Sequence, residues 1–243
     1  MNTQIGNWKI YALGDHAIVF ALEDKVDPMV IHKIMSLHHF ILSKKRNGIV
    51  DSIPSYHTLT IVYDVNIFFT STTNTEAQLM SFANQMIHET NAIPKSFENK
   101  NAALIKIPVC YESEFAIDIQ NMSTQKNISV NEIIQLHTDK IYEVYSIGFL
   151  PGFAYMGIVD ERIQMLRHEK PRVQVLAGSV GIAGVQTGIY PSNSPGGWQI
   201  IGRTPLRIFD PNPNILAKFN VGDQIQFYAI SKNEFEKLNE HNN

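Results

Sequence analysis

The chain has 243 residues, of which 44% are hydrophobic and 18% are charged, and its formal net charge is −3. The hydrophobic fraction supports a packed core and excludes a largely disordered chain, and the slight acidic excess gives no reason to expect binding to nucleic acid or an anionic membrane. The single cysteine, Cys110, excludes an internal disulfide and any site built on a cysteine pair. Because no signal-peptide pattern and no uninterrupted run of 18 apolar residues occurs, we expect a cytoplasmic protein without a membrane span.

The first hundred residues alternate short β-type runs with two amphipathic helical patterns. Apolar runs predict strands over residues 8–13, 17–22, 49–53, 58–63 and 104–109. An Asp-Pro pair at 27–28 and a TNTE capping box at 73–76 each predict the start of a helix, because a side-chain oxygen there accepts from free backbone N–H groups. The order of these elements predicts an α+β fold that begins with an α/β sandwich lobe over residues 1–98, its helices covering one sheet face.

The composition changes in the second half of the chain. A polar segment near residues 91–101 predicts a linker, and an SVNE capping box at 129–132 predicts a short helix ending near His137. Residues 173–202 contain no charged side chain and seven of the chain's 14 glycines, which is typical of barrel strands joined by tight turns. We therefore predict a second domain over residues 99–243, with an all-β barrel from 103 to 230 and a terminal helix or tail.

Several common catalytic patterns are missing from the sequence. It contains no GxxxxGK[ST] phosphate loop, no GxGxxG after a strand, no HExxH and no GxSxG. The nine histidines show no ligand spacing, so we predict no metal site.

Two loops combine proline and glycine residues, which restrict or bend the backbone, with aromatic side chains. In the first, GFLPGFAY at 148–155, Pro151 and Gly152 fix a sharp turn, and Phe149, Phe153 and Tyr155 are candidate pocket walls. The alternative is a packed corner of the barrel.

In the second loop, SPGGW at 194–198, the amides of Gly196 and Gly197 are candidates for an anion-binding concavity. Ser194 would add a hydroxyl group and Trp198 a stacking face. The alternative is a hairpin turn with a buried tryptophan.

Charged candidates lie at the edges of the neutral segment. Arg172 and Arg203 bracket it, and a guanidinium group suits a carboxylate or a phosphate. Each arginine is also consistent with a structural ion pair. His137 is the histidine near this region and is a candidate helix cap or proton donor. Together these residues predict a polar, uncharged cleft for a small anionic or phosphorylated ligand.

Four motifs in order resemble one known family: GFLPGFAYMG (148–157), KPR (170–172), AGSVGIAGVQTGIYP (177–191) and SPGGWQIIGRTPL (194–206). The family is that of the 5-oxoprolinase B subunit, also labelled allophanate hydrolase subunit 1 and Kip inhibitor of a histidine kinase. The chain departs from the usual pattern at residues 110–113, at 116–118 and at Leu176.

The resemblance implies an N-terminal α+β lobe followed by a cyclophilin-like β-barrel. It also implies partner subunits A and C, and ATP with Mg²⁺ as co-substrate for opening 5-oxoproline to L-glutamate, with this chain inactive alone. Arg172, Arg203 and His137 are then the catalytic candidates. Further substrate- or nucleotide-binding candidates come from the third motif: Gly178, Ser179, Gln186, Thr187 and Tyr190.

Two other functions stay open at this point. The chain is alternatively an inhibitory module that binds a sensor histidine kinase, or a carboxyltransferase component acting in a urea or allophanate pathway. The sequence has no Met-Lys-Met biotin-attachment motif, so this chain is not expected to carry biotin.

Overall fold

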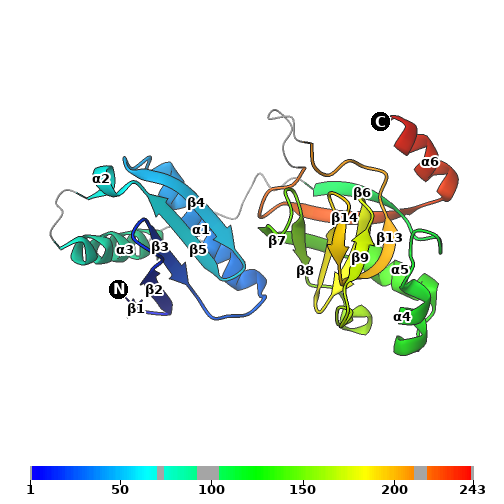
Figure 1. Cartoon of the computed structure of the whole chain (residues 1–243). Helices are drawn as coiled ribbons and strands as arrows, with labels where there is room; N and C mark the ends of the chain where they lie inside the picture. The colour runs from blue at the N-terminus through cyan, green and yellow to red at the C-terminus, as the bar shows by residue number, and fades with distance from the viewer. Residues whose placement is uncertain (1, 70–73, 92–103, 211–217, 242–243) are drawn as a thin grey trace. The chain divides into compact units, whose positions relative to one another are not determined.

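The computed structural model describes residues 2–69, 74–91, 104–210 and 218–241 (Figure 1). The chain divides into two compact units, Met1–Asn101 and Ala102–Asn243. The first is a layered α+β unit and the second contains a closed β-barrel, which confirms the predicted fold class.

The first unit is built on one five-stranded antiparallel sheet with the order β1-β2-β3-β5-β4. Its strands are β1 (Asn2–Ile5), β2 (Trp8–Ala12), β3 (Ala17–Ala21), β4 (Ile49–Ser55) and β5 (Thr58–Tyr63). Alternation sets the two faces: in β5, Leu59, Ile61 and Tyr63 are buried, while the residues between them are half-buried. Four of these strands were predicted, and β1 was missed because NTQI lacks an apolar alternation.

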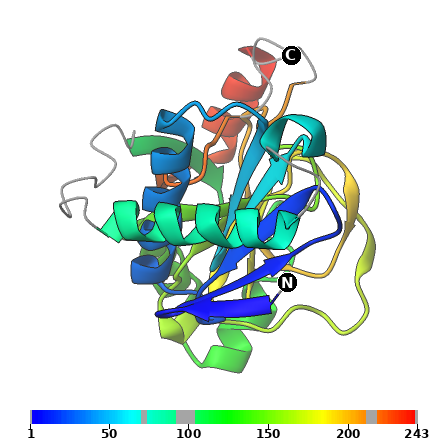
Figure 2. The same cartoon turned by 90° about the vertical axis from the view of Figure 1, so that its left-hand side faces the viewer.

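Two long helices, α1 (Pro28–Ser43) and α3 (Thr75–Asn91), cover one face of this sheet, and Figure 2 shows them crossing in front of it. A short helix, α2 (Val65–Phe68), follows β5. As predicted, Asp27 caps α1, and its carboxylate accepts a 2.8 Å hydrogen bond from the Met29 amide. The predicted capping box at 73–76 begins at a residue outside the described ranges.

The second unit contains a closed seven-stranded barrel with the order β10-β11-β8-β7-β14-β6-β13. Its strands are β6 (Leu104–Cys110), β7 (Ile141–Ile147), β8 (Ala154–Gly157), β10 (Ser179–Ala183), β11 (Gln186–Ile189), β13 (Gln199–Arg203) and β14 (Gln224–Ile230). The β14–β6 pair is parallel and the other pairs are antiparallel. A separate two-stranded sheet joins β9 (Arg172–Val175) to β12 (Ser194–Gly196).

Helices accompany the barrel, so the expectation of an all-β segment from 103 to 230 was too simple. They are α4 (Ile119–Lys126), α5 (Val130–Thr138), the 3-10 turn η1 (Glu161–Ile163) and the C-terminal α6 (Lys232–His241). The predicted helix near His137 is α5, and Ser129 caps it by accepting a 3.1 Å hydrogen bond from the Glu132 amide. Helix α4 was missed because its mostly polar sequence carries little apolar periodicity.

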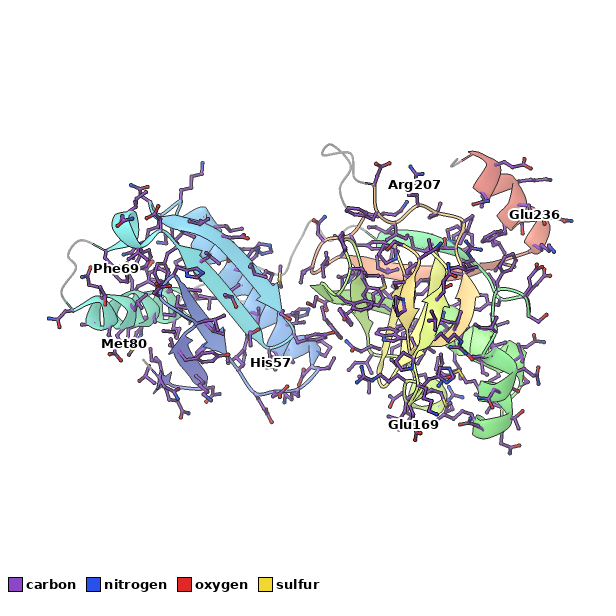
Figure 3. All side chains as sticks on the ribbon, in the orientation of Figure 1. His57, Phe69, Met80, Glu169, Arg207 and Glu236 are labelled. Atoms are coloured by element: carbon purple, nitrogen blue, oxygen red, sulfur yellow. The ribbon has the colours of Figure 1, made fainter. Side chains whose placement is uncertain are left out.

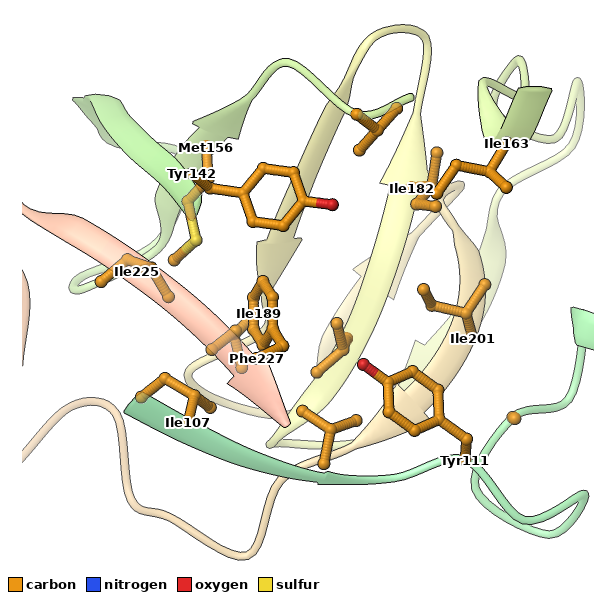
Figure 4. Close-up of a cluster of buried hydrophobic side chains, with 14 of the residues drawn as sticks. Ile107, Tyr111, Tyr142, Met156, Ile163, Ile182, Ile189, Ile201, Ile225 and Phe227 are labelled. Atoms are coloured by element: carbon orange, nitrogen blue, oxygen red, sulfur yellow. The ribbon is translucent and has the colours of Figure 1, made fainter. Parts of the chain in front are cut away.

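Apolar side chains fill the interior of the barrel (Figure 4). The labelled members of this core come from all seven strands and from adjoining segments: Ile107, Tyr111, Tyr142, Met156, Ile163, Ile182, Ile189, Ile201, Ile225 and Phe227. The glycine-rich segment supplies three of the strands, β10, β11 and β13. Glycine allows close packing there, since a Cβ on Gly188 would lie 2.8 Å from the Ala154 carbonyl oxygen.

Candidate functional site

A partly buried ion pair fixes the first end of the neutral segment. Arg172 donates from Nη2 to Oδ1 of Asp118, and its Nη1 lies 3.4 Å from the Trp198 carbonyl oxygen. The second carboxylate oxygen of Asp118 accepts a 2.6 Å hydrogen bond from the Ile200 amide. Asp118 is only 4% exposed. Its contacts with Arg172 and Ile200 join three segments that are distant in sequence. The guanidinium group of Arg172 is therefore largely engaged in hydrogen bonds with the protein itself.

His168 lies against the same carboxylate. Its Nε2 atom is 3.4 Å from Oδ1 of Asp118, while its backbone amide donates a 2.6 Å hydrogen bond to the Gly197 carbonyl. About a quarter of the side chain, 27%, is exposed, yet Nε2 is buried and has no hydrogen-bond partner among the described residues. Sequence reasoning missed Asp118 because 54 residues separate it from Arg172, and it missed His168 because His137 was considered as the histidine of this region.

Arg203, at the other end of the segment, makes fewer hydrogen bonds with the protein than Arg172 does. Its Nε donates a 2.8 Å hydrogen bond to the Ala177 carbonyl, and its guanidinium carbon lies 6.0 Å from the ring centre of Phe235 in α6. Burial lowers the pKa of Arg203 from its ordinary value. Within the described ranges its two terminal nitrogens make no hydrogen bond, so their donors are free for an anion.

Five aromatic side chains form one cluster near Trp198. Phe153 is its buried centre, 1% exposed, with ring-centre distances of 4.8 to 5.6 Å to its neighbours. Those neighbours are Phe149, Tyr155, Tyr190 and Trp198. Burial raises the pKa of Tyr155, whereas the positive charge of Arg167 lowers it, which places Arg167 close to this cluster. The predicted pocket wall is therefore mostly a packed corner of the barrel, with Phe149 exposed at its edge.

Phe149 forms that open edge. It is 62% exposed and has a φ of +69°, a left-handed conformation that is costly for a residue with a Cβ. Gly152, three residues later, has a φ of +80° and lies against Phe209, so the turn around Pro151 is sharp, as predicted.

The glycine pair of the second loop serves close packing. Gly196 pairs with Arg172 between β12 and β9, and a Cβ on it would overlap the Tyr190 ring. Neither Gly196 nor Gly197 has a positive φ, so the pair does not form the alternating conformation of an anion-binding concavity. Ser194 is buried, and its hydroxyl lies 3.2 Å from the Pro195 carbonyl oxygen.

The candidates of the third motif are parts of the barrel wall. Gly178 has a φ of +82° beside the Thr204 carbonyl, and Ser179 is 5% exposed. Gln186 pairs with Gly157 across β11 and β8. These positions support the strands that hold the loops described above.

His137 lies inside the barrel and is completely buried. Its Nδ1 is 2.7 Å from the Tyr111 hydroxyl, its Nε2 is 3.0 Å from Thr187 Oγ1, and its ring stacks on Phe227 at 4.5 Å. The Thr187 hydroxyl also lies 3.0 Å from the Gly181 carbonyl, so it donates there and accepts from His137. Burial lowers the pKa of His137 to about 3. This environment favours a structural role over the proton-donor role expected from the sequence.

The structure therefore brings some candidates together and separates others. Arg172, Trp198, Tyr155 and Tyr190 lie near residues 167–171 and Asp118, and Phe149 joins them through its contact with Phe153. His137 and Thr187 belong instead to the barrel interior.

Two surface hollows are lined by residues that do not belong to this cluster. One, of about 580 Å³, is lined by residues of β6, β14 and the end of α5, including Lys106 and Gln226. The other, of about 600 Å³, is lined by residues near β1 and β2 in the first unit. Neither is lined by residues 173–202, most of whose strands belong to the barrel wall.

Metal-binding clusters and membrane-spanning helices are absent from the described ranges. These ranges contain no group of three or more His, Cys, Asp or Glu side chains placed to hold a metal ion. No helix among them has the length and apolar character needed to cross a bilayer.

Comparison with known proteins places the chain in a family. The model of the carboxyltransferase domain, subdomain C and D, matches residues 8–217. The B subunit of 5-oxoprolinase from Bacillus subtilis (strain 168) is 33% identical over 237 residues, which are 97% of this chain and 98% of that protein.

Solved structures share the fold. The crystal structure of TTHA0988 has a TM-score of 0.73 at 26% identity and covers 88% of this chain, which spans 40% of that longer chain. A conserved uncharacterized protein from Pyrococcus horikoshii is 37% identical, with a TM-score of 0.53 over 93% of this chain and 99% of that one. These findings confirm the family predicted from the four motifs. The chain belongs to the family of the carboxyltransferase domain, subdomain C and D.

Proposed function

We propose that this chain is the B subunit of an ATP-dependent 5-oxoprolinase, which with subunits A and C opens 5-oxoproline to L-glutamate. The observation that carries the proposal is the 33% identity to a 5-oxoprolinase B subunit over nearly the whole of both chains. A match of this extent includes both units and all four motifs, so it supports a role shared by the whole chain.

The chemistry requires positioning and charge more than a protein nucleophile. A five-membered lactam is a stabilised amide, and transfer of the ATP γ-phosphoryl group to its oxygen makes the ring carbon electrophilic. The terminal nitrogens of Arg203 make no hydrogen bond within the described residues, and Arg167 is an exposed cation whose charge acts on Tyr155. These groups suit a substrate carboxylate or a phosphoryl oxygen, with Mg²⁺ bound to the nucleotide.

Because the neutral segment is packed into the barrel, we propose that other polypeptides complete the site. The Arg172–Asp118 pair and the aromatic cluster leave an edge at Phe149, and we propose that this edge is where the C partner closes the site. This arrangement accounts for a chain that is inactive alone.

An omission experiment tests the function. This chain and its A and C partners are mixed with ATP, Mg²⁺ and 5-oxoproline, and L-glutamate and ADP are measured. We expect formation of both products to require all three polypeptides. Glutamate formation that is unaffected when this chain is omitted would contradict the proposal.

Substitution of Arg203 tests its part in that function. In the assembled complex, R203A should lower kcat/KM for 5-oxoproline by about 100-fold, since a charge-assisted contact to the reacting anion is lost. Arg207, an exposed arginine that pairs with Asp210, provides the matched control R207A, which should keep normal turnover. Normal turnover by R203A would show that the arginine assignment is wrong.

Two alternatives remain as proposals of lower rank. The family description favours a carboxyltransferase component, which would act with a separately supplied biotin carboxylase and carboxylate a urea-type substrate. An inhibitory module would instead bind a histidine kinase dimer and block its autophosphorylation. Each predicts that the mixture of all three polypeptides does not release glutamate.

A further inference from the structure

We propose that His168 is the proton-transfer residue of this site and that Asp118 orients it. The inference rests on the function proposed above and deepens it, because it names the group that moves protons when the lactam ring opens.

The first support is the placement of Nε2. It is buried 3.4 Å from Oδ1 of Asp118, and it makes no hydrogen bond within the described residues. Once this contact closes to a hydrogen bond, the carboxylate would fix the ring hydrogen on Nε2 and leave the lone pair on Nδ1 to act as the base. The separation is longer than a formed hydrogen bond, as is common in catalytic sites without ligand, and it would shorten when substrate closes the site.

The second support is that the rest of the ring is accessible. The side chain is 27% exposed although Nε2 is buried, so the exposure belongs to its other atoms, and Nδ1 is not among the buried polar atoms that lack a partner. His137 is the opposite case, since it is 0% exposed and both of its ring nitrogens have partners. Of these two histidines, the geometry leaves only His168 able to meet a ligand.

The third support is the rigid frame around the ring. The His168 amide is tied to Gly197, and Asp118 is held by Arg172 and by the Ile200 amide. A carboxylate fixed by two donors cannot turn away from the imidazole. Such preorganisation is what a proton-transfer residue requires.

The proposed step balances in atoms and charge. After phosphorylation of the lactam oxygen, a water oxygen bonds to the ring carbon, and the carbon–nitrogen bond breaks with its electron pair going to nitrogen. Both water protons end on that nitrogen as the amine forms. Nδ1 carries them one at a time from oxygen to nitrogen, and His168 is neutral again after each transfer. The ring carbon is then part of an acyl phosphate, which a second water hydrolyses to carboxylate and phosphate.

The test uses the complex assembled from all three polypeptides, with 5-oxoproline, ATP and Mg²⁺. H168A should lower kcat at least 100-fold and change KM for 5-oxoproline less than threefold. Free imidazole should raise the kcat of H168A at least tenfold. A purely structural role for the side chain does not predict such a rescue. H168Q, which keeps an N–H toward Asp118 but has no base, should be as slow as H168A and insensitive to imidazole.

The matched control is H57A. His57 lies in the first unit (Figure 3), has the same 27% side-chain exposure and sits 3.4 Å from a carboxylate, that of Asp24, which is itself exposed. H57A should keep wild-type kcat. Wild-type turnover by H168Q, or loss in H168A without imidazole rescue, would overturn the role of His168 alone. A wild-type complex that forms no glutamate would overturn the proposed function, and this role with it.

Discussion

At the scale of single residues, His137 shows how a polar side chain becomes part of a barrel core. Tyr111 donates to its Nδ1, Nε2 donates to Thr187, and the Thr187 hydroxyl donates to the Gly181 carbonyl. Every polar atom in this chain of hydrogen bonds has a partner only while the imidazole is neutral. The neutral His137 ring is therefore buried without an unpaired charge.

Removal of this side chain should destabilise the protein. H137A leaves the hydroxyl of Tyr111 unsatisfied and opens a cavity, which costs about 3 kcal/mol in the free energy of unfolding. Urea unfolding followed by circular dichroism measures this change. H16A, at a histidine whose side chain is 64% exposed, should leave the unfolding midpoint unchanged. Equal midpoints for H137A and the wild type would contradict the structural role.

The same residue predicts a pH dependence of stability. Unfolded His137 binds a proton near pH 6.5, whereas burial holds its folded pKa at about 3. The unfolded state therefore binds more protons between these values, and stability falls as the pH decreases from 6.5 toward 3. The slope from this group is about 1.4 kcal/mol per pH unit. Urea midpoints measured from pH 7 to pH 4 should show a shallower decline for H137F than for the wild type, and identical slopes would refute the assignment.

At the scale of elements, the glycine of strand β11 allows close packing that a larger residue would disrupt. Gly188 faces the Ala154 carbonyl, and a backbone oxygen cannot move aside as a flexible side chain does. G188A should therefore destabilise the protein by about 2 kcal/mol through overpacking. A Cβ on Gly148 would meet nothing within 4 Å, and its φ lies outside the left-handed region, so G148A is the matched control. Thermal unfolding measures both, and a G188A protein as stable as G148A would contradict the packing described.

The cap of α5 gives a second element-scale prediction. Ser129 satisfies one of the free amides of that helix, and S129A should cost about 1 kcal/mol in stability. S129N keeps a capping oxygen and should recover most of the loss. An S129A protein with wild-type stability would show that the cap contributes little.

Elements of this kind were the most predictable part of the structure. Strand β5 and the Asp27 and Ser129 caps follow from local patterns, because alternation and capping depend on residues close in sequence. The contacts of the candidate site do not. Asp118 meets Arg172 across 54 residues and Ile200 across 82, and such a juxtaposition depends on closure of the barrel.

The predicted ligand cleft illustrates the same limit. The lack of charge in residues 173–202 favours the lining of a polar cleft when only the sequence is considered, but three of its pieces are barrel strands with buried residues. Neutral glycine-rich sequence suits a tightly packed wall as well as a pocket, and only the three-dimensional neighbours distinguish the two. The turn around Pro151, in contrast, was predictable because proline and glycine fix the backbone locally.

At the scale of the whole molecule, the chain consists of two compact units, and each has its own buried core. The second unit holds the Asp118–His168–Arg172 group and the exposed Phe149 edge. Under the function proposed above, this group and this edge belong to a site that partner subunits complete.

The most direct measurement is a titration of this chain into fixed amounts of its A and C partners, with ATP, Mg²⁺ and 5-oxoproline in excess. The account predicts that the initial rate of glutamate release rises from zero and saturates at a defined ratio of the three polypeptides. Full release of glutamate by the two partners before any of this chain is added would contradict it.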